Sequence, residues 1–291
     1  MVGQEAKDKA KNIFKGCYVA TLTPYNSSDA VDSGMVRAHA QWLVENGIAG
    51  LCPGGTTGEF LFLSDAERRQ VVSATVEGVA GRVPVIAGVW AERSDAAADL
   101  ARHAEATGAQ GVFLPTPIYY PADDDVVFHW YENVHKATSL PLFAYNIPQY
   151  AANTVSIACL HRLFADGIIV GVKDSTGKTE RVSDLVREFG AKGIVFAASD
   201  GFATEGLRLG ADGFISAIGN ATPRLFAKLW AGDETLQPHV DALRTTLKQM
   251  GSIAALKYLL KRQGFDFSHS RLPYSDLKDT HKSLLDAIEL V

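Results

Sequence analysis

The sequence predicts a (β/α)8 barrel with a C-terminal helical extension, and two observations support this fold class. Short runs rich in Val, Ile, Leu and Phe alternate with longer helical patterns from Gly16 onward. Their apolar continuity is typical of strands covered on both faces in a parallel sheet. Eight such runs, each followed by a helical pattern, fit the ~250 residues typical of a barrel.

The expected strands lie in eight segments of the chain. They are "CYVATLTP", "GLCPGG", "VPVIAGV", "GVFLPTP", "LPLFAYNIP", "IIVGVKDS", "IVFAASD" and "GFISAIGN". A doubly wound open sheet is the alternative, but such sheets usually carry a glycine-rich nucleotide loop after the first strand. The first strand here leads into "ATLTPYNSSD", which has no such loop.

The helical patterns carry start and stop signals. Ser64 and Glu67 have the spacing of a capping box, and Thr222 precedes Pro223 as an expected N-cap before a first-turn proline. Left-handed C-caps favour glycine. The glycines that follow helical patterns are Gly47, Gly108 and Gly210.

The pattern changes after Trp230, where only helical segments follow. We therefore expect a catalytic barrel over residues 13–232 and a C-terminal helical domain over residues 233–291.

The composition and charge of the chain argue against several kinds of partner and site. The chain has 291 residues, 47% of them hydrophobic, and a net charge of -5 with scattered Lys and Arg. Nucleic acid and anionic membrane are therefore not expected partners. The three cysteines are widely spaced, which indicates neither a disulfide framework nor a zinc site. The charged N-terminal segment is unlike a signal peptide, and we expect a cytoplasmic protein.

Active-site residues of a barrel gather at the carboxyl ends of its strands. The polar and pocket-lining candidates at these positions are Thr56, Thr57, Tyr119, Tyr120, Tyr145, Tyr150, Lys173, Ser175, Ser199, Asp200, Ile215 and Ser216. Each of these residue types can also occur at such positions for structural reasons alone. Gly and Thr are common in turns, tyrosines often lie in cores or at rims, and an aspartate before glycine often caps a helix.

Lys173 is the most informative candidate because it ends an apolar strand. By itself it would most often be a solvated strand-end lysine. Residues two apart in a strand share a face, so Gly171, Lys173 and Ser175 point the same way. If that face is the barrel axis, Gly171 leaves room for the lysine stem. A buried amine is more easily deprotonated, and a neutral amine attacks ketones to form a Schiff base. Neighbouring hydroxyls would then transfer protons or hold a carboxylate, so a keto acid is the expected ligand, without a metal or cofactor.

Three motifs, "GGTTGE", "YNIP" and "GVKDS", together resemble those of the dihydrodipicolinate synthase/N-acetylneuraminate lyase family of class I, pyruvate-type aldolases. The resemblance covers nearly the whole chain. It implies a barrel with a C-terminal helical domain and a homotetramer built as a dimer of dimers. It further implies that Lys173 forms the Schiff base and that Tyr145 relays protons.

The resemblance also assigns the surrounding residues. Thr56 and Thr57 match the pair that binds the substrate carboxylate, with Thr57 also touching the tyrosine chain. Tyr119 matches a tyrosine that a neighbouring subunit inserts, and the backbone of Ile215 lines the pyruvate pocket. Further substrate contacts are expected from Tyr150, Ser175 and Asp200.

One position departs from the family pattern. In dihydrodipicolinate synthases an arginine lies five residues after the tyrosine of "YN" and grips a carboxylate, whereas this chain has Tyr150. Tyrosine cannot replace a charged, bidentate clamp, so we expect a substrate with a neutral distal half. Sialic acid lyases share "YNIP" but usually have serine-threonine where this chain has Thr56-Thr57.

The favoured function is therefore a lyase that cleaves or forms a C–C bond in a 2-keto-3-deoxy sugar acid or a related 4-hydroxy-2-oxo acid, with pyruvate as one product. The alternatives are 4-hydroxy-tetrahydrodipicolinate (dihydrodipicolinate) synthase, N-acetylneuraminate lyase, a keto-deoxy sugar acid dehydratase, and a catalytically silent barrel that binds a keto acid.

Overall fold

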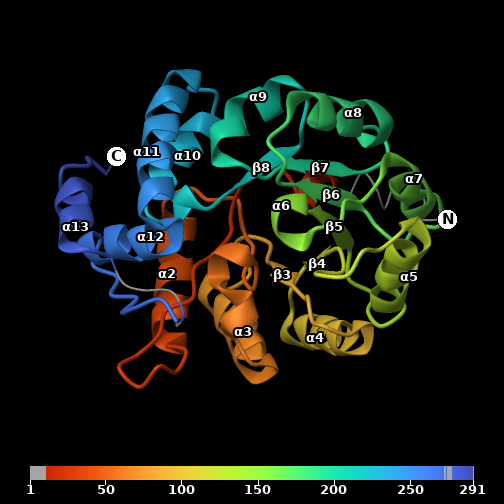
Figure 1. The fold of residues 1–291 in the computed structure, drawn as a ribbon, viewed down its shortest axis with the longest axis horizontal. Coiled ribbons are helices and arrows are strands. Elements are labelled where there is room, and N and C mark those ends of the chain that lie inside the picture. The colour runs from red at the N-terminus through yellow and green to blue at the C-terminus, as the bar shows by residue number, and fades with distance from the viewer. Residues whose placement is uncertain (1–10, 272, 274–276, 291) are drawn as a thin grey trace.

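The computed structural model describes residues 11–271, 273 and 277–290, and in that part of the chain eight parallel strands form a barrel (Figure 1). Neighbouring strands follow the order β2-β1-β8-β7-β6-β5-β4-β3. A parallel bridge from Leu51 in β2 to Val85, just before β3, joins the ends of this order. The strands are β1 (Gly16–Val19), β2 (Gly50–Leu51), β3 (Ile86–Gly88), β4 (Gly111–Pro115), β5 (Leu142–Asn146), β6 (Gly171–Asp174), β7 (Ile194–Ala197) and β8 (Gly213–Ser216).

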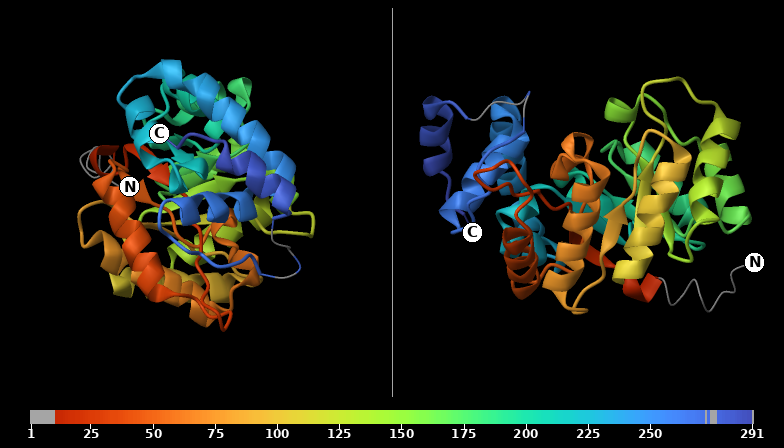
Figure 2. Two further views of the ribbon diagram at one scale, coloured as in Figure 1. Left: turned by 90° about the vertical axis from the view of Figure 1, so that its left-hand side faces the viewer. Right: turned by 90° about the horizontal axis from the view of Figure 1, so that it is seen from below.

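Helices surround the strands, as Figure 2 shows from two directions. They are α2 (Ser33–Glu45), α3 (Asp65–Val79), α4 (Ser94–Thr107), α5 (Asp124–His135), α6 (Pro148–Ala151), α7 (Ile157–Ala165), α8 (Thr179–Phe189), α9 (Ala203–Arg208) and α10 (Pro223–Trp230). Short 3-10 turns occur at η1 (Thr56–Gly58), η2 (Phe60–Phe62), η3 (Asp200–Phe202), η4 (Ile218–Asn220) and η5 (Glu234–Leu236). Among the helices of the described residues, none is long and apolar enough to cross a membrane.

The predicted fold class is confirmed. Each of the eight apolar runs contains a strand, and every strand residue is buried. This burial explains why the runs lack the polar alternation of a one-sided sheet. Side chains on one face fill the barrel, and those on the other pack beneath the helices.

The predicted helix signals are confirmed with one difference. Ser64 and Glu67 form both bonds of the capping box at the start of α3. Helix α10 begins at Pro223, but the Thr222 hydroxyl donates to the carbonyl of Ile218, 3.2 Å away, instead of capping the helix. The expected C-cap glycines have positive φ angles, the conformation that glycine tolerates best. They are Gly47, Gly108 and Gly210.

The C-terminal helices are α11 (Gln237–Met250), α12 (Ser252–Arg262) and α13 (Asp279–Asp286). In Figure 1, α11 and α12 lie on the side of α10 and α2, and α13 lies outside them against α12. They share a hydrophobic cluster with the barrel. In that cluster Val240, Leu256 and Leu285 are fully buried together with the strand residues Cys17 and Val19. The helical segment is thus packed on the barrel through apolar contacts.

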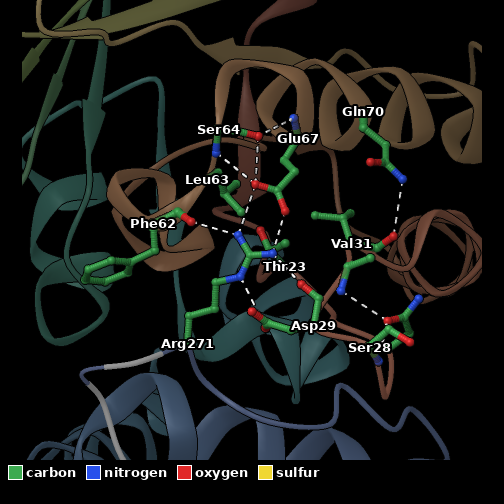
Figure 3. A network of polar contacts seen from close by, with 12 residues as sticks. Thr23, Ser28, Asp29, Val31, Phe62, Leu63, Ser64, Glu67, Gln70 and Arg271 are labelled. Carbon is green, nitrogen blue, oxygen red and sulfur yellow. Dashed lines mark hydrogen bonds and ion pairs between the residues drawn. The ribbon is translucent and has the colours of Figure 1, made fainter.

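Arg271, in the segment after α12, forms a polar network with the loops that follow β1 and β2 (Figure 3). Its guanidinium donates to both carboxylate oxygens of Glu67 and to the carbonyl of Phe62. It also donates to the side chain and the carbonyl of Asp29. The arginine thereby links the C-terminal segment to two loops on the barrel.

A buried ion pair forms a second link between the same parts. Lys257 of α12 pairs with Glu59, and both side chains are less than a twentieth exposed. Glu59 follows η1 and has a left-handed backbone conformation, with a φ of 57°. Removing one partner of such a pair leaves a buried charge uncompensated, which typically costs ~3–5 kcal/mol. The final glutamate of "GGTTGE" therefore holds its loop against the C-terminal helices.

The Glu67–Arg271 contact predicts a dependence of stability on pH. Hydrogen bonds from Arg271 lower the pKa of Glu67 from 4.5 to about 2. A depressed carboxyl pKa stabilises the folded state above the ordinary pKa, and this contribution is lost as the pH falls toward the folded-state value. At about pH 6 the free energy of unfolding of the wild-type protein should therefore exceed that of the Glu67→Gln variant. This difference should shrink as the pH falls from 4.5 towards 2.

Urea unfolding of both proteins across this range measures the difference. Glutamine retains a side-chain acceptor for the capping box, so the comparison isolates the charge. Glu180→Gln, on the outer helix α8, is the matched control. A difference between wild type and Glu67→Gln that stays constant with pH would contradict the prediction.

Candidate active site

The carboxyl ends of the strands surround a cavity of about 330 Å³. Its wall combines the loop after β2, the ends of β5, β6 and β8, and the turn after β7. The sequence-predicted residues that line it are Thr56, Thr57, Tyr145, Tyr150, Lys173, Ser175, Ser199, Asp200 and Ile215. The barrel thus brings together candidates that come from five strand ends.

Lys173 lies inside the barrel and is only 3% exposed. It stands between Tyr145 of β5 and Phe196 of β7 in the strand register. Its Nζ atom lies 4.0 Å from the ring centre of Tyr145 and 4.3 Å from that of Phe113. No carboxylate among the described residues forms an ion pair with it. The solvated strand-end interpretation is therefore wrong, and the amine faces the cavity among aromatic rings.

Gly171 has a different role from the one expected. It was predicted to leave room for the lysine stem. A Cβ atom there would lie 2.6 Å from the carbonyl oxygen of Ile194 and 2.7 Å from the ring of Phe143. The space at Gly171 is thus filled by Phe143 and the neighbouring strand. The glycine permits a dense layer below Lys173, which supports the lysine from beneath.

The cysteines do not compete with Lys173 as nucleophiles. All three are buried. Burial raises the pKa of Cys52 to about 12 against the opposing effect of Lys173, and burial raises the pKa of Cys159 to about 11. The pKa of Cys17 is also raised well above its ordinary value by burial. Because the thiolate is the reactive form, these thiols are poor nucleophiles near neutral pH.

Tyr145 contacts the threonine loop through its hydroxyl group. The hydroxyl oxygens of Tyr145 and Thr56 lie 3.4 Å apart, and Tyr145 is 4% exposed. The sequence analysis gave this contact to Thr57. Because η1 begins at Thr56, its two threonines point in different directions, and the first one reaches the tyrosine. Thr57 still lines the cavity.

Two motif residues beside Tyr145 and Lys173 fix the strand ends, a role that the sequence analysis missed. Asn146 donates to the carboxylate of Asp174 at 2.8 Å and accepts from the backbone N–H of Val155 at 3.2 Å. Arg181 of α8 pairs with the same carboxylate at 3.3 Å. Asn146 and Asp174 are almost fully buried. Their adjacency in the motifs "YNIP" and "GVKDS" was the available signal, since buried polar groups require partners.

Asp200 and Ser175 place polar groups in the cavity wall. Asp200 accepts a hydrogen bond from the Ser216 hydroxyl. Burial raises the pKa of Asp200, although the bonds from Ser216 and the backbone oppose this shift. Ile215 is 5% exposed and supplies an apolar wall, whereas Tyr150 lies at the rim and is 67% exposed. The cavity therefore offers hydrogen-bonding groups and an aromatic edge beyond Lys173.

Comparison with known proteins identifies the family. Residues 13–289 match the model of the dihydrodipicolinate synthetase family. A 4-hydroxy-tetrahydrodipicolinate synthase from Bartonella bacilliformis is 34% identical over 284 residues, covering 94% of this chain and 97% of the relative. The chain belongs to the dihydrodipicolinate synthetase family. The predicted class, a pyruvate-type lyase or aldolase that acts through a Schiff base, is thereby confirmed.

Solved structures of the family share this barrel. The 4-hydroxy-tetrahydrodipicolinate synthase of Methylacidiphilum fumariolicum SolV is 28% identical, with a TM-score of 0.88 and coverage of 94% of both chains. A Ruminococcus gnavus sialic acid aldolase, a catalytic lysine mutant, superposes with a TM-score of 0.91 over 94% of both chains at 23% identity. At 23% identity, the similarity to the sialic acid aldolase structure establishes the fold only.

Tyr119 lies outside the cavity of its own chain. It is 80% exposed and has a φ of 80°, which is uncommon for a residue with a side chain. Its ring packs edge-on against Tyr120, with ring centres 5.1 Å apart. The loop after β4 thus holds two large aromatic side chains at the surface. The role predicted for Tyr119 in a neighbouring subunit remains a prediction.

The C-terminal helix α11 adds two cations to the cavity wall, Arg244 and Lys248. The sequence analysis missed both. They lie four residues apart, and side chains with that spacing share a helix face. The spacing was visible in "LRTTLK", but it could not reveal that this face meets the cavity. The docking of α11 on the turn after β7 decides that.

Gly171 provides a test of the packing beneath Lys173. Gly171→Ala should lower the free energy of unfolding by ~1–3 kcal/mol, the usual cost of overpacking. The carbonyl of Ile194 belongs to a neighbouring strand and cannot move aside cheaply. Urea unfolding measures this change.

Gly34→Ala is the matched control, because the Cβ atom there would meet a carboxylate oxygen of Asp32 at 3.3 Å and no atom of a neighbouring strand. Equal stability of Gly171→Ala and wild type would show that the layer below Lys173 is not closely packed.

Proposed function

We propose that this chain cleaves a 2-keto-3-deoxy sugar acid, or a related 4-hydroxy-2-oxo acid, into pyruvate and an aldehyde, and that it catalyses the reverse reaction as well. The observation that carries the proposal is the placement of Lys173 in one cavity with Tyr145 and the threonine loop. A buried amine without an ion-pair partner can attack the carbonyl group of a keto acid to form an imine, and neighbouring hydroxyl groups can transfer the protons.

In the first step, Thr56 and Thr57 bind the C1 carboxylate through hydroxyl and backbone N–H groups. The Nζ atom of Lys173 then attacks C2. The carbonyl oxygen takes one proton from the amine and one from solvent and leaves as water, which gives a protonated imine. Binding the carboxylate orients C2 over the amine, and orientation of this kind is worth ~7 kcal/mol or more.

In the second step, the Tyr145 oxygen accepts the proton of the C4 hydroxyl group while the tyrosine's own proton passes to the Thr56 hydroxyl oxygen. The C3–C4 bond breaks, its electron pair moves into the imine to form an enamine, and the aldehyde departs. Protonation of C3 and hydrolysis of the imine then release pyruvate and the free amine. The contact between Tyr145 and Thr56 supports a hydroxyl chain that returns the proton.

Ser175 and Asp200 are the proposed contacts for hydroxyl groups beyond C3, because both line the same cavity. Tyr150 lies at its rim, where an arginine would provide a carboxylate clamp. Tyrosine supplies an aromatic face and one hydroxyl group, which favours cleavage of a hydroxylated acid. A second candidate is 4-hydroxy-tetrahydrodipicolinate synthase, favoured by the relative that is 34% identical.

We further propose that the active protein is a homo-oligomer, a tetramer built as a dimer of dimers. The large exposed hydrophobic side chains include Leu61, Tyr119, Tyr120 and Tyr150, and aromatic residues are enriched in interfaces. In such an assembly Tyr119 would extend the hydroxyl chain of a neighbour.

Replacing Tyr145 separates imine formation from bond cleavage. Tyr145→Phe should still form an imine, because the ring beside Lys173 remains. It should lose turnover by ~10²- to 10⁴-fold, the usual contribution of a positioned acid or base. Borohydride reduction with pyruvate, followed by peptide mass spectrometry, measures the first property, and pyruvate release measures the second.

Lys173→Ala should give no reduced three-carbon adduct, whereas the matched control Lys178→Ala should be labelled like wild type. Labelling of Lys173→Ala at the wild-type level would disprove the Schiff-base role. If Tyr145→Phe turns over within a few-fold of wild type, another residue transfers the proton.

A comparison of substrates tests the proposed reaction. The unmodified protein should release pyruvate from 2-keto-3-deoxy acids faster than it condenses pyruvate with aspartate semialdehyde, because Ser175 and Asp200 line the cavity as contacts for a hydroxylated chain and no arginine stands at position 150. Coupled lactate dehydrogenase detects pyruvate, and absorbance of the cyclic product detects condensation. Faster condensation than any sugar-acid cleavage would establish the second candidate instead.

A further inference from the structure

Helix α11 presents an unusual pair of charges to the active-site cavity. Arg244 is half-buried and Lys248 is exposed, and both contribute to the wall that also contains Lys173. Lys173 comes from inside the barrel, whereas α11 belongs to the C-terminal helices. The two cations therefore belong to a different part of the cavity wall from the barrel strand that carries Lys173.

The position of Arg244 is fixed by the docking of its helix. At the start of α11, the amide of Gln237 donates to the carbonyl of Asp200 at 3.1 Å and accepts from Thr204. A Cβ atom at Gly201 would lie 3.0 Å from an Nη atom of Arg244. The glycine thus allows the guanidinium to lie close against the turn after β7, and a larger residue would push it away.

These cations form no ion pair in the part of the chain that the structure describes, although the charge of Arg244 acts on nearby Asp200. Among residues 11–271, 273 and 277–290, neither Arg244 nor Lys248 forms an ion pair or a side-chain hydrogen bond. The one carboxyl group among the lining residues belongs to Asp200. That group already accepts bonds from Ser216 and the backbone of Ile218, and the charge of Arg244 lowers its pKa, against the larger effect of burial, without an ion pair between them. The donors of the guanidinium remain available for a ligand.

We propose that Arg244, assisted by Lys248, binds an anionic group at the distal end of the substrate, either a carboxylate or a phosphate ester. This inference rests on the proposed function, which places the keto carbon at Lys173 and the C1 carboxylate at Thr56 and Thr57. A guanidinium binds planar carboxylate or phosphate oxygens through paired hydrogen bonds. It supplies the charge that position 150 lacks, so the neutral distal half expected from Tyr150 is replaced by a charged one.

Oxo acids that differ only at the distal end test the carboxylate. Borohydride trapping on Lys173 should need a lower concentration of 2-oxoadipate than of 2-oxohexanoate, by about tenfold or more, in line with a charge-assisted hydrogen bond. Arg244→Gln should remove this preference, and Arg244→Lys should retain part of it. Arg224→Gln, an exposed arginine bonded to Asn46 outside the cavity, is the matched control.

The phosphate arm compares 2-keto-3-deoxy-6-phosphogluconate with 2-keto-3-deoxygluconate in pyruvate release. If the phosphorylated acid has the lower KM and Arg244→Gln removes this difference, the subsite binds phosphate. If only the borohydride experiment shows a preference, for 2-oxoadipate over 2-oxohexanoate, the subsite binds carboxylate. Labelling of Arg244→Gln by pyruvate at the wild-type level shows that the variant is folded.

The outcomes separate the two claims. Failure of wild type to be labelled by pyruvate would overturn the proposed function together with the inference that rests on it. Normal labelling by pyruvate, with no preference for either anionic compound or a preference that survives in Arg244→Gln, would overturn the distal anion site alone.

Discussion

The parallel register of β5, β6 and β7 is the constraint on which the site depends. It places Tyr145, Lys173 and Phe196 side by side at one level of the barrel. Because the strands are parallel, their carboxyl ends meet at the same end, so a side chain on each can reach a common point. A shift of one residue in β6 would turn Lys173 outward beneath the helices. Gly171, packed against Phe143, makes such a shift costly by matching one strand closely to its neighbour.

Polar contacts at the strand ends keep this arrangement in place. Asn146, Asp174 and Arg181 join β5, β6 and α8 just outside the cavity. These groups are mostly buried, so loss of any one partner would leave another unsatisfied at a cost of ~1–3 kcal/mol. Asn146 and Asp174, which follow Tyr145 and Lys173 in the two motifs, therefore have a structural role at the strand ends.

The C-terminal helices contribute to the wall of the cavity as well as to the fold. Lys257 pairs with Glu59 directly after the threonine loop, and Arg271 bonds to the loops that follow β1 and β2. Gln237 fastens α11 to the turn at Asp200. Through these contacts the helical segment orients the loop that carries Thr56 and brings Arg244 to the cavity. The barrel end and the C-terminal helices consequently form one structural unit around the cavity.

The sequence by itself determined the eight strands, the barrel and most of the polar residues that line the cavity. Buried parallel strands leave a strong local signal of continuous apolar runs, and Lys173 was conspicuous because a charge ended such a run. Local signals could not assign the threonine that meets Tyr145 or the true role of Gly171. Both depend on how η1 and Phe143 are oriented by neighbouring strands. In the sequence, Arg244 and Lys248 have the spacing of an ordinary polar helix face. This spacing is the same whether the face meets solvent or a cavity. Only tertiary structure decided that this face meets the cavity, since contacts between segments far apart in the chain leave no pattern within either segment.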